Sequence, residues 1–256
     1  MELLQLAEKS GTIKSSIRSD REGPMKILVV SDIESKFIWD HFDPERFRDV
    51  KMIISCGDLS ARYLSFLVTM IPCPLFYVPG NHDKKYEREP PEGCVNIDGR
   101  VIEYKGVRLM GLGGCKSPHP CLYEYSDEQM WRKVKRLEPQ IRRSKGIDLF
   151  VTHAPALGLG DGPDLFHEGF QSFRYIDDVY KPAIHFYGHR HLGENPMDRR
   201  AIYPYNESVM INACGYKIVE FDPGVPMDTP PGTHSVVDMP TPMPPRRFPF
   251  PVFRQK

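Results

Sequence analysis

Five short polar segments carry the side chains that could bind metal ions and move protons, and each follows an apolar run. The segments are VSDIESK, CGDLS, PGNHD, VTHAP and YGHRH, and their candidate residues are Asp32, Glu34, Asp58, Asn81, His82, Asp83, His153, His189 and His191. The ligand atoms they offer are carboxylate and amide oxygens and imidazole nitrogens, without thiolate. This set favours Mn²⁺, Fe or Zn²⁺ in a reactive centre over a sulfur-ligated structural zinc.

The spacing of these residues suits a crowded centre with two metal ions. An aspartate can bridge two ions with its two oxygens, and a pair of ions about 3.5–4 Å apart can hold the attacking and leaving oxygens of an in-line displacement. Glycines beside Asp58, Asn81 and His189 permit the tight turns that such a centre needs. His189 and His191, at i and i+2, place both rings on one side of an extended chain, as chelation requires.

The elements that must position these segments alternate along the chain. Strands are expected at residues 26–31, 52–55, 75–78, 100–104, 107–110, 148–152, 183–187, 208–211 and 217–220, and helices at residues 37–47, 61–70 and 127–144. The fourth and fifth strands have the pattern of a hairpin, and the last two that of a closing pair. This alternation predicts a parallel sheet with crossover helices, in which sites collect at the carboxyl ends of strands.

Composition limits the classes of function. The chain of 256 residues has 34 basic and 34 acidic side chains, so its formal net charge is zero and nothing global points to nucleic acid or a membrane surface. It has six cysteines without a CxxC pair, and no long apolar leader. These features predict a cytoplasmic protein with reduced thiols.

The two ends differ from the middle of the chain. We expect an N-terminal extension at residues 1–24, one α/β domain at residues 25–221, and a proline-rich arm at residues 222–256. Proline fixes φ and lacks an amide donor, so the arm should form neither a helix nor an inner strand. Phe248, Phe250, Val252 and Phe253 suggest that it docks on its own domain or on a neighbouring subunit of a homo-oligomer.

Taken in order, the five segments resemble those of the calcineurin-like metallophosphoesterases, over about residues 25–219. The stretch THAPALGLGDGPD…KPAIHFYGHRHLGE…VMINA further resembles the metallophosphoesterase-domain (MPPED-like) branch. The resemblance implies an α/β fold in which two mixed β-sheets pack as a sandwich with flanking helices, the four-layer αββα arrangement. It also implies two divalent metal ions, with Mn or Fe favoured over Zn or Mg.

The resemblance implies a role for each residue. Asp32, the residue at position 34, Asp58 and His191 would hold the first metal, with Asp58 as the bridge. Asn81, His153 and His189 would complete the second. His82 would stabilise the transition state and protonate the leaving oxygen after in-line attack by a hydroxide held by both metals, and Asp83 would orient His82.

Position 34 departs from the family pattern, which has histidine where this chain has Glu34. Direct or water-mediated ligation by Glu34 would make the first site harder and favour Mn²⁺, Mg²⁺ or Fe over Zn²⁺. The other reading places Glu34 outside the ligand set and leaves the first metal weakly held.

Other polar residues carry less weight. Lys116 and His119, in the glycine-rich loop at residues 111–126, are candidates to contact a phosphate oxygen, or else belong to an ordinary connection. Structural roles are expected for the remaining histidines, for Arg190 and for Cys56; these histidines are His41, His167, His185 and His234.

The sequence therefore predicts a metal-dependent phosphohydrolase that acts on a small phosphoester. A phosphodiester such as a cyclic nucleotide is favoured over a phosphomonoester or phosphoprotein; a membrane or nucleic-acid partner is not expected. The alternative is a scaffold of the same fold that binds metal or nucleotide and catalyses little, and Glu34 is its only support.

Overall fold

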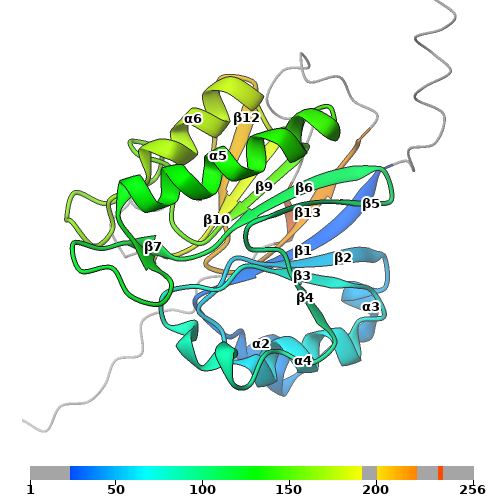
Figure 1. The fold of residues 1–256 in the computed structure, drawn as a ribbon. Coiled ribbons are helices and arrows are strands. Elements are labelled where there is room, and N and C mark those ends of the chain that lie inside the picture. Colours follow the sequence, from blue (N-terminus) through cyan, green and yellow to red (C-terminus); the bar gives the residue numbers. More distant parts are fainter. Residues whose placement is uncertain (1–23, 192–200, 224–235, 239–256) are drawn as a thin grey trace, which may run out of the picture.

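Four layers make up the fold in the computed structural model, which describes residues 24–191, 201–223 and 236–238. Two six-stranded sheets lie face to face and helices cover both outer faces (Figure 1). Sheet A has the strand order β14-β13-β1-β2-β3-β4, and sheet B has the order β11-β12-β10-β9-β6-β5. The predicted αββα sandwich of two mixed sheets is confirmed.

Sheet A is parallel over four neighbouring strands and antiparallel at one side. Its strands are β1 (Met25–Ser31), β2 (Val50–Ser55), β3 (Leu75–Tyr77), β4 (Cys94–Asn96), β13 (Gly215–Phe221) and β14 (Val236–Asp238). Strands β1 to β4 run parallel, whereas β13 pairs antiparallel with β1, and β14 with β13. The carboxyl ends of β1, β2 and β3 therefore meet at one edge of the sheet.

Sheet B repeats this arrangement with a parallel centre and antiparallel sides. Its strands are β5 (Arg100–Tyr104), β6 (Val107–Leu112), β9 (Leu149–Thr152), β10 (Ile184–Tyr187), β11 (Ile202–Tyr205) and β12 (Ser208–Asn212). The central strands β6, β9, β10 and β12 are parallel, and β5 and β11 pair antiparallel at the two sides. Two short strands, β7 (Cys115–Lys116) and β8 (Glu124–Tyr125), pair separately.

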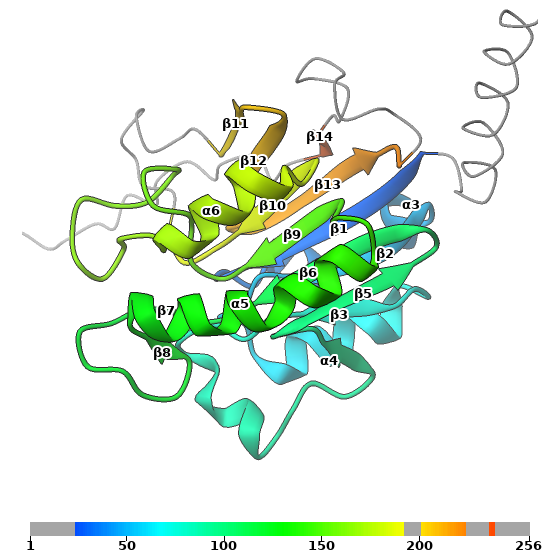
Figure 2. The same ribbon diagram turned by 45° about the horizontal axis from the view of Figure 1, so that its top comes forward.

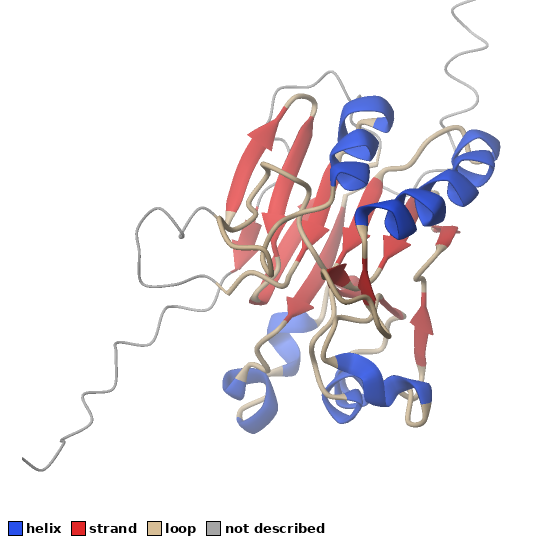
Figure 3. Ribbon diagram, turned by 60° about the vertical axis from the view of Figure 1, so that its left-hand side comes forward, coloured by secondary structure: helices blue, strands red, loops and turns tan. Residues whose placement is uncertain are grey.

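The helices divide between the outer faces, as Figures 2 and 3 show. Sheet A is covered by α2 (Lys36–Asp40), α3 (Pro44–Phe47) and α4 (Ala61–Met70), and sheet B by α5 (Asp127–Arg143) and α6 (Gln171–Tyr180). A short 3-10 helix, η1 (Asp83–Glu87), follows β3. None of the helices in the described ranges is long and apolar enough to cross a membrane.

Alternation of side chains along the strands produces three separate core clusters. In β1, Ile27 and Val29 point between the sheets, while Leu28 and Val30 point toward the helices on sheet A. The third cluster fills the space between sheet B and its two helices, with Phe150 and Phe173 in edge-to-face contact. Burial on both faces explains why the central strands read as continuous apolar runs.

Three details of the sequence prediction were wrong. Residues 37–47 form two short helices instead of one, because Asp43 caps a new helix that begins at Pro44. The expected closing pair at residues 208–211 and 217–220 is split, since β12 belongs to sheet B and β13 to sheet A. Helix α6 was not predicted; its first turn has no side-chain cap, and its buried face packs on sheet B.

Most of both chain ends lies outside the described residues. This includes nearly all of the N-terminal extension and the phenylalanines of the proline-rich arm. From the arm, Val236–Asp238 forms β14, an edge strand of sheet A.

Candidate metal centre and active site

The predicted residues meet at one edge of the sandwich, where strands of both sheets end. Asp32 follows β1, Asp58 follows β2, and Asn81 lies in the turn after β3, all in sheet A. From sheet B come His153, directly after β9, and His189, two residues after β10. The site therefore draws on both sheets.

The aspartates of sheet A are held by backbone amides. Both carboxylate oxygens of Asp32 accept hydrogen bonds from the His189 amide, at 3.0 and 3.1 Å, and the side chain is fully buried. Asp58 Oδ1 accepts from the His82 amide at 2.9 Å. Asp32 and Asp58 have φ values of 61° and 57°. Such left-handed conformations of non-glycine residues concentrate at functional sites.

The two carboxyl groups differ in acidity. Burial raises the pKa of Asp32, since it disfavours the charged form. Burial would also raise the pKa of Asp58, but the imidazole of His153 and the amide of His82 outweigh it and lower the pKa to about 2. Asp58 is therefore a carboxylate at neutral pH.

Glycines bring the chain segments unusually close at this edge. A Cβ on Gly80 would lie 2.1 Å from Oδ1 of Asp58, and one on Gly188 would lie 2.0 Å from Oγ of Ser31. Gly57, with φ of +93°, adopts a conformation that favours glycine. The expectation that glycines serve a crowded centre is confirmed.

Asp83 has a different contact from the one expected. Its Oδ2 accepts hydrogen bonds from the amides of Asp58, at 2.8 Å, and Gly80, at 2.7 Å. It thus ties the turn after β2 to the turn after β3, instead of orienting the ring of His82. Burial raises the pKa of Asp83 to about 6, although the bond from Gly80 acts in the opposite direction.

His153 is fully buried and has both ring nitrogens engaged. Nδ1 lies 2.7 Å from the carbonyl oxygen of Cys56, to which it donates. Nε2 then faces two oxygens, Oδ1 of Asn81 at 3.0 Å and Oδ2 of Asp58 at 3.3 Å. A lone pair on Nε2 facing oxygens repels them unless a proton or a metal ion lies between.

The raised pKa of His153 also indicates that its surroundings favour a positive charge. Burial alone would lower this pKa, yet the carboxylates of Asp58 and Asp32 raise it to about 9. A proton therefore occupies Nε2 when no metal is bound. Neutral imidazole, carboxylate and amide oxygen are common ligands of divalent ions. The residues present are therefore suited to bind a metal ion.

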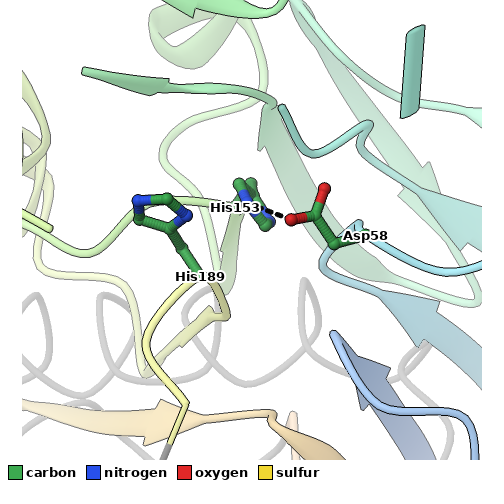
Figure 4. A group of neighbouring side chains, drawn as sticks. All are labelled: Asp58, His153 and His189. Carbon is green, nitrogen blue, oxygen red and sulfur yellow. Dashed lines mark ion pairs between the residues drawn. The ribbon is translucent and has the colours of Figure 1, made fainter. Parts of the chain in front are cut away.

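His189 completes the group (Figure 4). Its Nε2 lies 2.7 Å from the carbonyl oxygen of Phe166, and burial lowers its pKa to about 4. The ring is therefore neutral, with Nε2–H donated to Phe166 and the lone pair on Nδ1. One ligand atom each from Asp58, His153 and His189 lies within 4.8 Å of the others.

His191 lies beside Asp32. Its Nε2 is 3.8 Å from Oδ1 of Asp32. Oε1 of Glu34 accepts from the amide of Ser60 at 3.2 Å, and Ser60 is the N-cap of α4. One carboxylate oxygen of Glu34 is therefore engaged by the backbone at the start of this helix.

The two weaker candidates lie elsewhere. Lys116 forms ion pairs with Asp127 and with Glu168, the latter at 3.0 Å, so its charge is already matched. The amide of His119 donates to Oγ of Ser117 at 3.2 Å. Neither residue is among those that line the cavity described next.

A cavity of about 530 Å³ opens over the candidate ligands. Its wall includes Asp58, His82, His167, His189, Arg190 and His191. Arg190 bonds the carbonyls of Gly160 and Asp161, which agrees with a structural role, but it also lines the cavity. His167 was expected to be structural; no motif surrounds it, so only the tertiary structure reveals its place. His185, by contrast, is the core histidine expected, buried against Asp177.

The comparisons agree with this geometry. A family model described as calcineurin-like phosphoesterase matches residues 25–193, and the chain belongs to this family. No curated protein sequence matches the chain.

Among solved structures, TT1561 of Thermus thermophilus is 17% identical with a TM-score of 0.52, covering 76% of this chain and 93% of that one. Vps29 of Chaetomium thermophilum is 11% identical (TM-score 0.35, 77% and 82% covered). A novel archaeal phosphodiesterase is 17% identical (TM-score 0.34, 78% and 94% covered). At these identities the likeness concerns the fold, and TM-scores below 0.5 carry no weight.

Membership in this family and the ligand group at the sheet edge together support metal-dependent hydrolysis of a phosphoester.

Proposed function

We propose that this protein hydrolyses a small phosphodiester with the help of two divalent metal ions, Mn or Fe. The observation that carries the proposal is the buried Nε2 of His153, which faces oxygens of Asn81 and of Asp58, a residue of the cavity wall. This arrangement is electrostatically favourable only with a cation between the three groups.

The ligands divide into two sets in this proposal. Asp32, Asp58 and His191 hold the first ion, and Asp58, Asn81, His153 and His189 hold the second. Glu34 stays outside and stabilises the start of α4 through its bond to Ser60. Oxygen and nitrogen ligands without sulfur support Mn or Fe.

His82 is the proposed proton donor. Its side chain is 81% exposed and lines the cavity, with Nε2 3.9 Å from Oδ2 of Asp58. Its backbone amide donates to the other oxygen of Asp58, so the main chain at His82 is held beside this carboxylate. Bound divalent ions would neutralise charge on the phosphoryl group and lower the pKa of water, while His82 gives a proton to the leaving oxygen.

The size of the cavity supports a diester. A volume of about 530 Å³ lies in the range of small-molecule sites and leaves room for a phosphorus centre with two organic substituents. Resemblance to the MPPED-like branch points the same way, and a cyclic nucleotide fits this class. A phosphomonoester or phosphoprotein is the alternative substrate.

The test is to measure metal content and turnover on the same purified protein. Mass spectrometry should find close to two metal ions per chain after loading with Mn²⁺. Bis-p-nitrophenyl phosphate should then be hydrolysed faster than p-nitrophenyl phosphate. The reverse preference would assign a monoesterase.

The scaffold alternative makes the opposite prediction. Less than one tightly bound metal and no turnover of either ester with any divalent cation would favour a binding module of the same fold. The near-complete ligand set argues against this outcome.

Location and assembly are further parts of the proposal. The cysteines form no disulfide among the described residues, which supports a reducing compartment, the cytoplasm. Residues 239–256 of the arm are proposed to bind the same domain or a second subunit. Size-exclusion chromatography of the full chain, and of a variant that ends at Asp238 and so keeps β14, would distinguish the two.

A further inference from the structure

We propose that the hydroxyl of Thr152 positions the candidate metal ligand His153. A buried chain of hydrogen bonds through His185 to Asp177 holds this hydroxyl in one direction. The inference rests on the proposed function, in which His153 binds the second ion, and it names the groups that aim this ligand. All four side chains are buried, and the proposed reaction uses only that of His153.

Alternation along β9 separates Thr152 from its neighbour His153. Phe150 points toward the helices on sheet B, and Val151 points between the sheets. Thr152 therefore lies on the helix side of the sheet. The ring of His153 extends the other way and reaches the carbonyl of Cys56, after β2 of sheet A, at 2.7 Å. The two neighbours face different layers of the sandwich.

The hydroxyl of Thr152 spans the ligand. Its Oγ1 donates to the carbonyl oxygen of Ala154 at 2.6 Å. A carbonyl oxygen can only accept, so this bond uses the one hydrogen of the hydroxyl. Because the bond joins the residues on either side of His153, it closes a turn around it. It thereby fixes the backbone from which the ring extends toward Asn81 and Asp58.

His185 fixes the direction of this hydroxyl. Its Nε2 lies 2.9 Å from Oγ1 of Thr152. Since the hydroxyl hydrogen is already used, Nε2 is the donor in this contact, whatever the charge of the ring. The other ring nitrogen, Nδ1, lies 3.0 Å from Oδ2 of Asp177, and one proton joins these two atoms whichever of them carries it. The chain of bonds is therefore continuous from Asp177 to the turn around His153.

This chain connects the helix layer with the metal edge. Asp177 lies in α6, His185 in β10 and Thr152 at the end of β9, and α6 covers the outer face of sheet B (Figure 1). Packing alone does not require the hydroxyl, because valine has the same shape as threonine. Groups that orient a ligand from behind typically contribute about 10- to 100-fold to metal affinity. We therefore assign to Thr152 a contribution to the affinity for the second ion.

Two substitutions at position 152 separate positioning from packing. Thr152→Val keeps the shape and removes the hydroxyl, whereas Thr152→Ser keeps the hydroxyl and removes a methyl group. In calorimetric titrations of the full metal-free chain with Mn²⁺, Thr152→Val should bind one of the two ions about 10- to 100-fold more weakly than the wild type. Thr152→Ser should bind both ions as the wild type does. Wild-type affinity in Thr152→Val, or an equal loss in both variants, would overturn the proposal.

Loss of stability must be distinguished from loss of positioning. Ile176→Ala is the matched control, because it removes a buried apolar side chain from α6 and leaves the hydrogen bonds of Thr152 in place. It should lower the midpoint of urea unfolding, as Thr152→Val does, and keep the wild-type affinity for Mn²⁺. An equal loss of affinity in Ile176→Ala would make the effect one of general stability and would refute positioning.

A substitution at His185 tests the outer part of the chain. His185→Phe keeps an aromatic ring in the core and removes the donor to Thr152. It should weaken the same ion, but by less than Thr152→Val, because Thr152 keeps its bond to Ala154. Wild-type affinity in His185→Phe would overturn the role assigned to His185 and Asp177.

A second readout is independent of metal and of turnover. The Nδ1–H of His153, buried against the carbonyl of Cys56, should give a downfield proton resonance that exchanges slowly with solvent. In the metal-free protein, Thr152→Val should shift this resonance and speed its exchange, and Thr152→Ser should leave it unchanged. If the wild type binds no Mn²⁺ or hydrolyses no ester, the proposed function fails, and this resonance still tests Thr152. The same shift and exchange rate in the wild type and both variants would refute the inference.

Discussion

The two sheets contribute different chemistry to the same edge. The candidate ligands of sheet A offer oxygen atoms, from Asp32, Asp58 and Asn81, whereas those of sheet B offer imidazole nitrogens, from His153 and His189. The orienting groups cross between the sheets: the amide of His189 holds Asp32, and the carbonyl of Cys56 holds His153. Each sheet therefore aims the ligands of the other, and neither could form the centre alone.

This comparison teaches where sensitivity to substitution should lie. Asp58 contacts partners from both sheets, because its two oxygens reach the amide of His82 and the ring of His153. In sheet B, His153 has a comparable role, because its ring faces Asn81 and Asp58 from sheet A. His82 also follows a strand of sheet A, but its side chain is exposed and lines the cavity.

The largest effect should come from the residue shared by both metal positions. Asp58→Ala should remove both ions, and His153→Ala only the second, if the sheets divide the ligands as proposed. We expect kcat of Asp58→Ala to fall on the order of 10³-fold or more, because the loss of both metal ions removes several kcal/mol of transition-state stabilisation. Mass spectrometry checks the metal count, and retention of two metals in Asp58→Ala would contradict bridging.

The next largest effect separates catalysis from ligation. His82→Ala should reduce kcat on the order of 10²-fold, the usual contribution of a general acid, with metal content nearly unchanged. Loss of metal from this variant would make His82 a ligand and give sheet A an imidazole in the centre. Asn81→Ala, which should lose the second metal, is the appropriate comparison.

A matched pair of glycine substitutions probes the close approach on each side. Gly80→Ala would drive a methyl group into Asp58, and Gly188→Ala one into Ser31 and Asp32. Both should cost about 1–3 kcal/mol in the free energy of unfolding and weaken metal binding. Urea unfolding and Mn²⁺ titration measure the two effects. An unchanged midpoint of urea unfolding in both variants would show that the neighbouring atoms at this edge can move to accommodate the added methyl groups.

The pH dependence of the metal-free protein should reflect His153. Its pKa of about 9 lies above the ordinary value of 6.5, so the stability that its proton contributes is complete below pH 6.5 and is lost as pH rises through 9. A metal must displace this proton, so Mn²⁺ affinity should rise up to about tenfold per pH unit over the same interval. Asp58→Asn should flatten the stability profile, because it removes the carboxylate that raises this pKa.

The smallest effect is expected at Glu34. Glu34→Gln should leave metal content unchanged and alter the free energy of unfolding by about 1 kcal/mol or less, because an amide oxygen can still accept from Ser60. Glu34→His should likewise change metal preference little. A clear shift toward Zn²⁺ in Glu34→His would instead mean that position 34 ligates the first metal.

Sequence alone predicted most of the fold and the polar side chains that meet at one edge of the sandwich. Apolar runs ending in Asp, Asn or His identified the strand ends, because a buried strand excludes polar side chains until it reaches the edge of the sheet. Helix α4 was predicted with its observed bounds, and α5 within one residue. Both begin at a serine cap, which is a local feature of the sequence.

What sequence could not predict depends on contacts between distant segments. Strands β12 and β13 read as neighbours, yet the chain passes between the sheets at Ala213 and Cys214, where Ala213 donates to the carbonyl of Tyr187. Helix α6 has no cap that marks its start, and packing of Phe173 and Ile176 against sheet B stabilises it instead.

The sequence by itself identified the candidate ligands that follow the strands, since residue type and position at a strand end are local properties. Only the tertiary structure decided how they are held and what joins them. It directed the carboxylate of Asp83 to two backbone amides, that of Glu34 to the start of α4, and the ring of His167 to the cavity. A hydrogen bond depends on distance and direction between segments far apart in the chain, and no local pattern encodes either.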